Sequence, residues 1–117
     1  MKSELSTSEM QKAVILYASK LGCFLWRNNT MGVWRGTGYQ HTGGILGGLG
    51  SPDLIGVLPN GKFIGIEVKN GSDKLSVEQI AFHDKIFQHN GYAFVCTSKH
   101  FQEFLDTLRQ VCEANRD

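Results

Sequence analysis

Two carboxylates and one lysine stand out in the middle of the chain because their types and spacing could do chemistry. Asp53 ends the segment Gly50-Ser51-Pro52-Asp53, and Glu67 and Lys69 follow it fourteen and sixteen residues later. Carboxylates held close together repel each other and are costly to bury unpaired, so they need a cation to share. Oxygen ligands suit Mg²⁺ or Mn²⁺, which could activate water and orient a phosphate, while the lysine could stabilise developing charge. The pattern favours metal-assisted cleavage of a phosphodiester.

The two runs that carry these residues are predicted to form the strands of a β-hairpin. Residues 53–58 and 62–69 are rich in β-branched residues, and Pro59-Asn60-Gly61 separates them. Pro59 and Asn60 suit the first two turn positions, and Gly61 can adopt the left-handed conformation. These choices favour a three-residue type I turn with a G1 bulge.

The turn sets the register of the hairpin. If Leu58 faces Lys62, Asp53 lies opposite Glu67 on one sheet face, with Cβ atoms roughly 5 Å apart. Lys69 shares that face because side chains alternate with period two, whereas a two-residue turn would shift the register and separate the carboxylates. The opposite face carries the predicted core residues Leu54, Ile64, Ile66 and Val68. A surface hairpin with solvated charges is the alternative, and the apolar strands argue against it.

These segments, together with Ser76-Val77-Glu78-Gln79, resemble the PD-(D/E)XK nuclease superfamily and, within it, the VRR-NUC branch. The resemblance covers roughly residues 50–98 and extends more weakly to the N-terminal helix. It implies that Asp53 and Glu67 bind the metal, that the Val68 carbonyl adds a ligand, and that Lys69 is catalytic.

The resemblance also implies functional roles for one residue on each of two helices. Glu9 completes the capping box Ser6-x-x-Glu9, and a cap is its simplest role. In related nucleases, however, a glutamate on the first helix approaches the metal, so we expect Glu9 to be a catalytic residue and metal neighbour. Gln79 completes a similar box, and the family places a glutamine of this helix near the catalytic lysine. We therefore expect Gln79 to complete the pocket.

Length and composition agree with a compact enzyme. The 117 residues are expected to form one domain, residues 1–117, around a single core. A net charge of +1 means that any DNA-binding surface must come from local clusters of Lys and Arg. Three cysteines without a Cys-x-x-Cys pair fit a reducing compartment and a small, packed role. With no apolar run of ~20 residues and no signal-peptide pattern, the sequence predicts a cytoplasmic, intracellular protein without a membrane span.

In the N-terminal half, helical spacing of apolar residues predicts a first helix that ends at Gly22. A short strand over residues 23–28 follows, with Phe24 and Trp26 on one face. The glycine-rich residues 30–50 are predicted to be a loop.

In the C-terminal half, Ser76 opens a helix that Gly91 closes, and residues 92–97 form a strand. Ser98 is predicted to cap a final helix with a clean apolar stripe. The predicted order is α-β-β-β-α-β-α, with the loop after the first strand. The fold class is therefore α/β, a restriction-endonuclease-like mixed β-sheet flanked by helices.

The glycine-rich segment has no Gly-Lys-Ser/Thr and opens no helix, so a nucleotide-binding loop and a nucleotide cofactor are not expected. It could let a DNA strand approach, helped by the charge and stacking groups Arg27, Arg35, Tyr39 and His41. The segment could equally be a loop without a function. A third option is a partner-binding surface, which the apolar residues Trp34 and Ile45-Leu46 could form. The candidate DNA contacts are Arg27, Arg35, Ser51 and Lys74.

The residues and the resemblance together predict a metal-dependent, structure-specific DNA endonuclease. A chain of this size has little surface for reading a long base sequence, so we expect it to recognise branched DNA such as four-way (Holliday) junctions. Symmetric incision of a junction needs two active sites, and stand-alone members of the family act as homodimers, so we expect a homodimer. The alternatives are a catalytically idle nucleic-acid-binding module in a larger assembly and a sequence-specific restriction enzyme.

Overall fold

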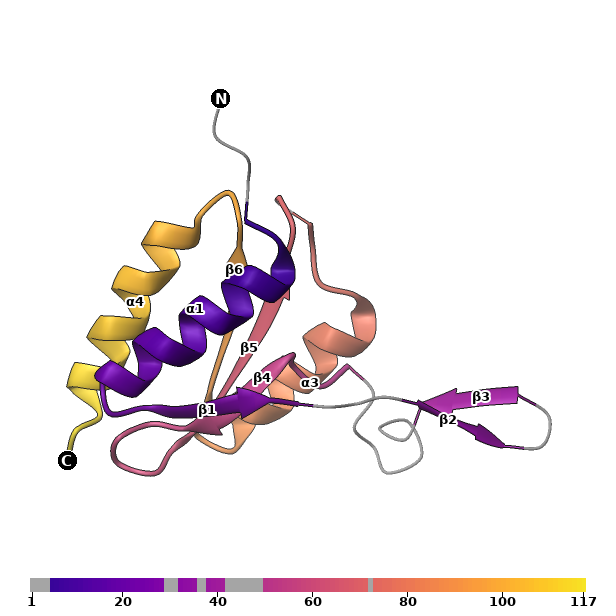
Figure 1. Ribbon diagram of the computed structural model, residues 1–117. Helices are drawn as coiled ribbons and strands as arrows, with labels where there is room; N and C mark the ends of the chain where they lie inside the picture. The colour runs from indigo at the N-terminus through magenta and orange to yellow at the C-terminus, as the bar shows by residue number, and fades with distance from the viewer. Residues whose placement is uncertain (1–4, 29–31, 36–37, 42–49, 72) are drawn as a thin grey trace.

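The computed structural model describes residues 5–28, 32–35, 38–41, 50–71 and 73–117, and in this part of the chain three helices flank a four-stranded sheet (Figure 1). For β2 and β3 it describes the backbone alone. In chain order the elements are α1 (Thr7–Lys20), β1 (Phe24–Arg27), β2 (Gly32–Arg35), β3 (Gly38–His41), β4 (Leu54–Val57), β5 (Phe63–Lys69), α3 (Val77–Gln88), β6 (Tyr92–Thr97) and α4 (Phe101–Ala114).

The sheet is mixed, with the strand order β1-β4-β5-β6. β1 pairs antiparallel with β4 and β4 with β5, whereas β5 and β6 are parallel and are connected through α3. A parallel pair needs a long crossover, which the helix supplies. The predicted fold class and the order α-β-β-β-α-β-α are confirmed.

The β4–β5 hairpin has the predicted register. Val57 pairs with Phe63 and Leu54 with Ile66, so the pairing brings Leu58 opposite Lys62 at the turn. The Leu58 N–H donates to the Lys62 carbonyl at 2.8 Å, and Gly61 has the left-handed φ of +90°. The three-residue loop therefore fixes which side chains share a face, as the turn residues predicted.

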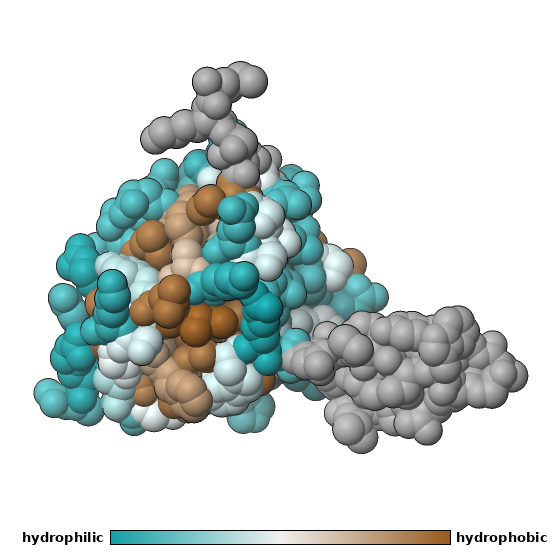
Figure 2. Space-filling view, in the orientation of Figure 1, coloured by the Kyte–Doolittle hydropathy of each residue, from teal (hydrophilic) through white to brown (hydrophobic). Residues whose placement is uncertain are grey.

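The two faces of the sheet are covered differently. α1 and α4 pack on one face, and α3 packs on β5 and β6 from the opposite face (Figure 1). The first face holds most of the core, whose buried members include Met10, Val14, Leu54, Ile64, Ile66, Leu108 and the free cysteines Cys23, Cys96 and Cys112. The outer side of α1 keeps Leu16 67% exposed, and Figure 2 shows apolar side chains gathered in the middle of the face that α1 crosses.

Both predicted capping boxes are present, but two helix boundaries differ from the prediction. Ser98 does not cap α4: His100 is the N-cap and makes no side-chain capping bond, while the Ser98 hydroxyl accepts the Gly71 N–H at 2.6 Å. After α3 the left-handed residue is Asn90, with φ of +65°. Gly91 is needed instead for close packing, because a Cβ there would lie 2.8 Å from Ile86 Cγ2.

The prediction of a loop for residues 30–50 is wrong in part. β2 and β3 form a separate two-stranded antiparallel sheet, with Gly32 opposite His41 and Arg35 opposite Gly38. Each strand carries an aromatic residue, and these residues favour pairing even where glycine is frequent. The predicted interaction sites Ile45 and Leu46 lie outside the described residues, as do the side chains of Trp34, Arg35, Tyr39 and His41.

Among the helices that the structure describes, none has the length and apolar character that crossing a bilayer requires.

Candidate active site

Asp53 and Glu67 lie against each other at the end of the β4–β5 hairpin. The Asp53 Oδ2 atom accepts the Val68 N–H at 2.8 Å, and the Asp53 carboxyl also hydrogen-bonds the Glu67 carboxyl. Glu67 is only 3% exposed, and its Oε2 atom has no hydrogen-bond partner. Burial is the largest cause and the contact with Asp53 the next, and together they raise the pKa of Glu67 to about 8. Glu67 is therefore costly to ionise without a cation.

Pro52, which lies two residues before β4, explains why a backbone carbonyl is left unpaired beside the two carboxylates. When the hairpin register is extended by two residues, Val68 lies opposite Pro52. In an antiparallel ladder every second pair exchanges hydrogen bonds, and this position is of the same kind as the hydrogen-bonded pair Leu58–Lys62. Proline has no N–H, so Pro52 cannot donate to the Val68 carbonyl. The Val68 N–H donates to the Asp53 carboxylate and not to the Pro52 carbonyl. The pairing of the two strands therefore ends beside the carboxylates, and the Val68 carbonyl is left there as an acceptor.

These groups fit a hard divalent cation. Two carboxylates, one with an unpartnered buried oxygen, and one backbone carbonyl are the oxygen ligands that Mg²⁺ and Mn²⁺ prefer. Mg²⁺ commonly keeps several waters and takes one or two carboxylates from the protein, so this small ligand set is sufficient. The residues that would hold the ion are Asp53, Glu67 and Val68.

Lys69 is the last residue of β5 and lies on the same sheet face as Glu67. Its carbonyl accepts the Ser98 N–H at 3.3 Å, and the Gly71 carbonyl accepts the Lys99 N–H at 3.3 Å. These bonds join the end of β5 to the segment after β6, so Lys69 and Lys99 lie at the same end of the sheet. Lys69 and Glu67 therefore share one sheet face at the end of β5.

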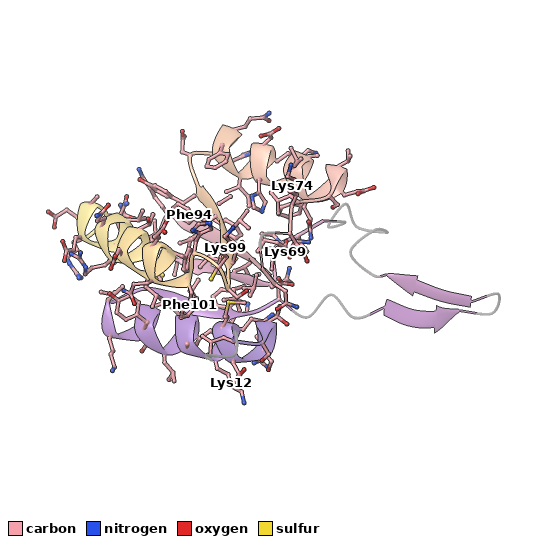
Figure 3. All side chains as sticks on the ribbon, turned by 90° about the horizontal axis from the view of Figure 1, so that it is seen from above. Lys12, Lys69, Lys74, Phe94, Lys99 and Phe101 are labelled. Carbon is pink, nitrogen blue, oxygen red and sulfur yellow. The ribbon has the colours of Figure 1, made fainter. Side chains whose placement is uncertain are left out.

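Three lysines from three segments lie around this end of the molecule. In Figure 3, which looks at it from above, Lys74 of the β5–α3 segment and Lys99 lie near Lys69, whereas Lys12 lies on the outer side of α1. All but Lys69 are exposed. Lys74 is a DNA contact predicted from the sequence, whereas no sequence signal points to Lys99. A local basic cluster forms here although the net charge of the chain is only +1.

Asn28 holds the segment that leads into Asp53. Its Nδ2 atom donates to Ser51 Oγ at 2.8 Å and to the Pro52 carbonyl at 3.0 Å. Its backbone N–H donates to the Asp53 carbonyl at 2.8 Å. The predicted DNA contact Ser51 thus has its hydroxyl engaged inside the protein, and Asn28, which sequence reasoning missed, is a positioning residue.

A cleft of about 340 Å³ opens at Asp53 and is lined by Gln11, Arg27, Asn28 and Asp53. Arg27, a predicted DNA contact, therefore borders the same cavity as Asp53. A guanidinium is a strong partner for a phosphate. Gln11 belongs to α1 and was not predicted, since an isolated glutamine on a helix carries no sequence signal.

The structure shows both predicted helix residues acting as caps. Glu9 is exposed and its Oε1 atom accepts the Ser6 N–H at 2.8 Å, a bond that lowers the pKa of Glu9. Gln79 accepts the Ser76 N–H at 2.8 Å. Within the described ranges no three His, Cys, Asp or Glu side chains gather closely enough to hold a metal ion, so Glu9 does not join Asp53 and Glu67.

An Asn28→Ala variant is expected to lose about 1–2 kcal/mol of stability and a larger share of cleavage, because both side-chain bonds to the segment before Asp53 disappear. The control is Asn60→Ala, since Asn60 Nδ2 donates to Asn115 Oδ1 at 3.0 Å at the far end of the hairpin. Chemical denaturation and cleavage rates measured on both variants check the prediction. Equal activity of the two variants at similar stability would contradict the positioning role.

Gly50 positions the same segment against α3. Its φ is +85°, and a Cβ there would collide with the Glu78 carbonyl and lie 2.8 Å from the Gln79 nitrogen. Gly61 has a similar φ of +90° but no atom within 4 Å of its Cβ position. Gly50→Ala is therefore expected to cost about 1–3 kcal/mol more than Gly61→Ala, because both strain the backbone but one also overpacks. Denaturant midpoints of the two variants measure the difference. Equal losses of stability would show that α3 shifts to accommodate the added Cβ at no cost, which would contradict the prediction.

Residues 46–100 of the chain match the family model of the VRR-NUC domain. Searches of curated proteins and of solved structures gave no match.

Proposed function

We propose that the chain is a Mg²⁺- or Mn²⁺-dependent DNA endonuclease that hydrolyses phosphodiester bonds in branched DNA, because residues 46–100 match the VRR-NUC domain, which is a nuclease-type domain. The observation that carries this proposal is the buried pair of Asp53 and Glu67, with its unpartnered oxygen and the carbonyl freed opposite Pro52.

Each group has a role in this reaction. Asp53, Glu67 and the Val68 carbonyl would hold the metal, which when bound would supply Lewis-acid activation of water and of the phosphate. Lys69, on the same face as Glu67, would stabilise the negative charge that develops on the phosphate oxygens. Arg27 would bind a phosphate in the cleft that it shares with Asp53.

Recognition of DNA shape is supported by the character of the basic cluster. Lys74 and Lys99 are exposed side chains from separate segments, and such lysines bind phosphates without reading bases. A four-way junction presents two equivalent strands for incision, so a homodimer would supply one active site for each.

The test is cleavage of labelled four-way junction, flap, single-stranded and linear duplex DNA with Mg²⁺, with Mn²⁺ and with a chelator. Asp53→Asn is the inactive variant, and Asp73→Asn is its control because Asp73 is an exposed acid in the segment after β5. We expect metal-dependent cutting that Asp53→Asn loses and Asp73→Asn keeps, with paired nicks in the junction.

Two results would overturn the proposal. Binding of these DNAs without any cutting would make the chain a nucleic-acid-binding module. Discrete fragments from linear duplex would make it a sequence-specific enzyme.

A further inference from the structure

Two aromatic side chains are exposed on the edge strand β1. Phe24 is 66% exposed and Trp26 is 42% exposed. Their ring centroids are 5.0 Å apart, with a tilt of 47° between the ring planes. Large apolar rings side by side on an edge strand are unusual for a surface that contacts only water.

The strand register places this aromatic pair on the sheet face of the carboxylates. Phe24 pairs with Val57 and Trp26 with Ile55, and paired residues share a face. Asp53 lies two residues before Ile55 and therefore belongs to the same face. The diagonal distance between Trp26 and Asp53 is then roughly 7–8 Å. Phe24 and Trp26 thus form a row that leads to the candidate active site.

α3 leaves this part of the face open. It packs on β5 and β6, and β1 lies at the other edge of the sheet. The row ends at polar groups, because Arg27 and Asn28 directly follow Trp26 and line the cleft with Asp53. The aromatic row therefore ends beside the cleft that opens at Asp53.

We propose that Phe24 and Trp26 form a stacking platform for an unpaired nucleobase of the DNA strand whose phosphodiester the Asp53–Glu67 pair cleaves. This inference rests on the proposed function and adds that, among branched DNAs, the protein prefers those with unpaired bases beside the cut.

The dimensions and chemistry agree with a nucleobase as the occupant. Stacked nucleotides in a strand advance about 3.4 Å each, so a base on Trp26 lies about two nucleotides from the phosphate at Asp53. Every base has a π face that an aromatic ring can stack on, whereas in duplex DNA those faces are already stacked. Arg27 follows Trp26 in β1 and lines the cleft with Asp53, where it can attract the backbone of the same strand.

The test measures binding separately from cleavage. Flap and single-stranded DNAs with 2-aminopurine at the unpaired positions, and a fully paired duplex with the same label, are titrated with the full chain in chelator. The variants are Trp26→Leu and Phe24→Leu, which keep apolar bulk. Phe87→Leu is the control, because Phe87 is 53% exposed on α3.

We expect wild type and Phe87→Leu to quench the label in unpaired DNA, and each platform variant to lose about tenfold or more in affinity for it. Duplex affinity is expected to be unchanged. Equal affinities of all four proteins for unpaired DNA would overturn the proposal. So would a loss of self-association with unchanged DNA binding, which would assign the platform to a second copy of the chain.

Failure of the platform and failure of the nuclease are distinguishable. In Mg²⁺, Trp26→Leu is expected to reduce the preference for flap DNA, which has unpaired bases, over the fully paired four-way junction, while its cutting of the junction remains. If wild type cuts no DNA but quenches the label through Trp26, the platform stands and the nuclease proposal is wrong. If wild type cuts with no preference that Trp26→Leu alters, the nuclease stands and the platform is wrong.

Discussion

A Lys69→Met variant is expected to lose metal-dependent cleavage by about a hundred- to a thousandfold, which is the usual cost of removing one preorganised group that stabilises transition-state charge. Methionine keeps the length and apolar stem of the side chain, so the end of β5 should keep its packing. The backbone bond between the Lys69 carbonyl and the Ser98 N–H does not depend on the side chain. The loss should therefore fall on the reaction rate and not on folding.

Lys62→Met is the matched control. Lys62 lies at the opposite end of the hairpin, is exposed, and uses its backbone to pair with Leu58. Single-turnover cleavage of the best substrate, with denaturation of both variants, gives the comparison. Cutting by Lys69→Met at the wild-type rate would remove Lys69 from the reaction.

The pH profile gives Lys69 a second readout. Its charge lowers the pKa of Glu67, against the larger effects of burial and Asp53. Residual cleavage by Lys69→Met should therefore need a higher pH than cleavage by wild type. If Lys69 has only a structural role, Lys69→Met should lower the cleavage rate equally at every pH and should not shift the pH profile.

Most of the fold and the heart of the site could be predicted because local rules decide them. A three-residue loop with glycine at its left-handed position sets the register, and the register alone brings Asp53 opposite Glu67. The starts of α1 and α3 could likewise be predicted, because each capping box is a pattern of four consecutive residues.

The missed features depend on contacts between distant segments. Asn28 binds Ser51 and Pro52 across 23 and 24 residues, and Ser98 binds Gly71 across 27. No local pattern reports such a bond, and the capping propensity of Ser98 pointed elsewhere. Lys99 carried no sequence signal, because its neighbours at the end of β5 come from another part of the chain. The β2–β3 pair was missed because frequent glycine outweighed the β-forming residues beside it.

The metal-free protein is expected to become less stable as the pH rises from 5 to 8, by up to about 4 kcal/mol. In the unfolded chain Glu67 titrates near its ordinary pKa of 4.5, and in the folded chain its pKa is raised to about 8. Between these values the folded state binds a proton that the unfolded state has lost. Stability from this group is therefore complete below pH 4.5 and is lost as the pH rises toward 8.

A divalent cation should reverse this loss, since it stabilises the ionised pair and binds the folded state alone. The measurement is the melting temperature of wild type, Glu67→Gln and Glu78→Gln at pH 5, 6, 7 and 8 in chelator and in Mg²⁺. Glu78 is the control because it is an exposed acid at the start of α3. Glu67→Gln should flatten the pH dependence and lose the stabilisation by Mg²⁺ at pH 8, because the amide neither ionises nor offers a charged ligand. Wild-type behaviour of Glu67→Gln would mean that the buried carboxylate pair is not what the cation binds.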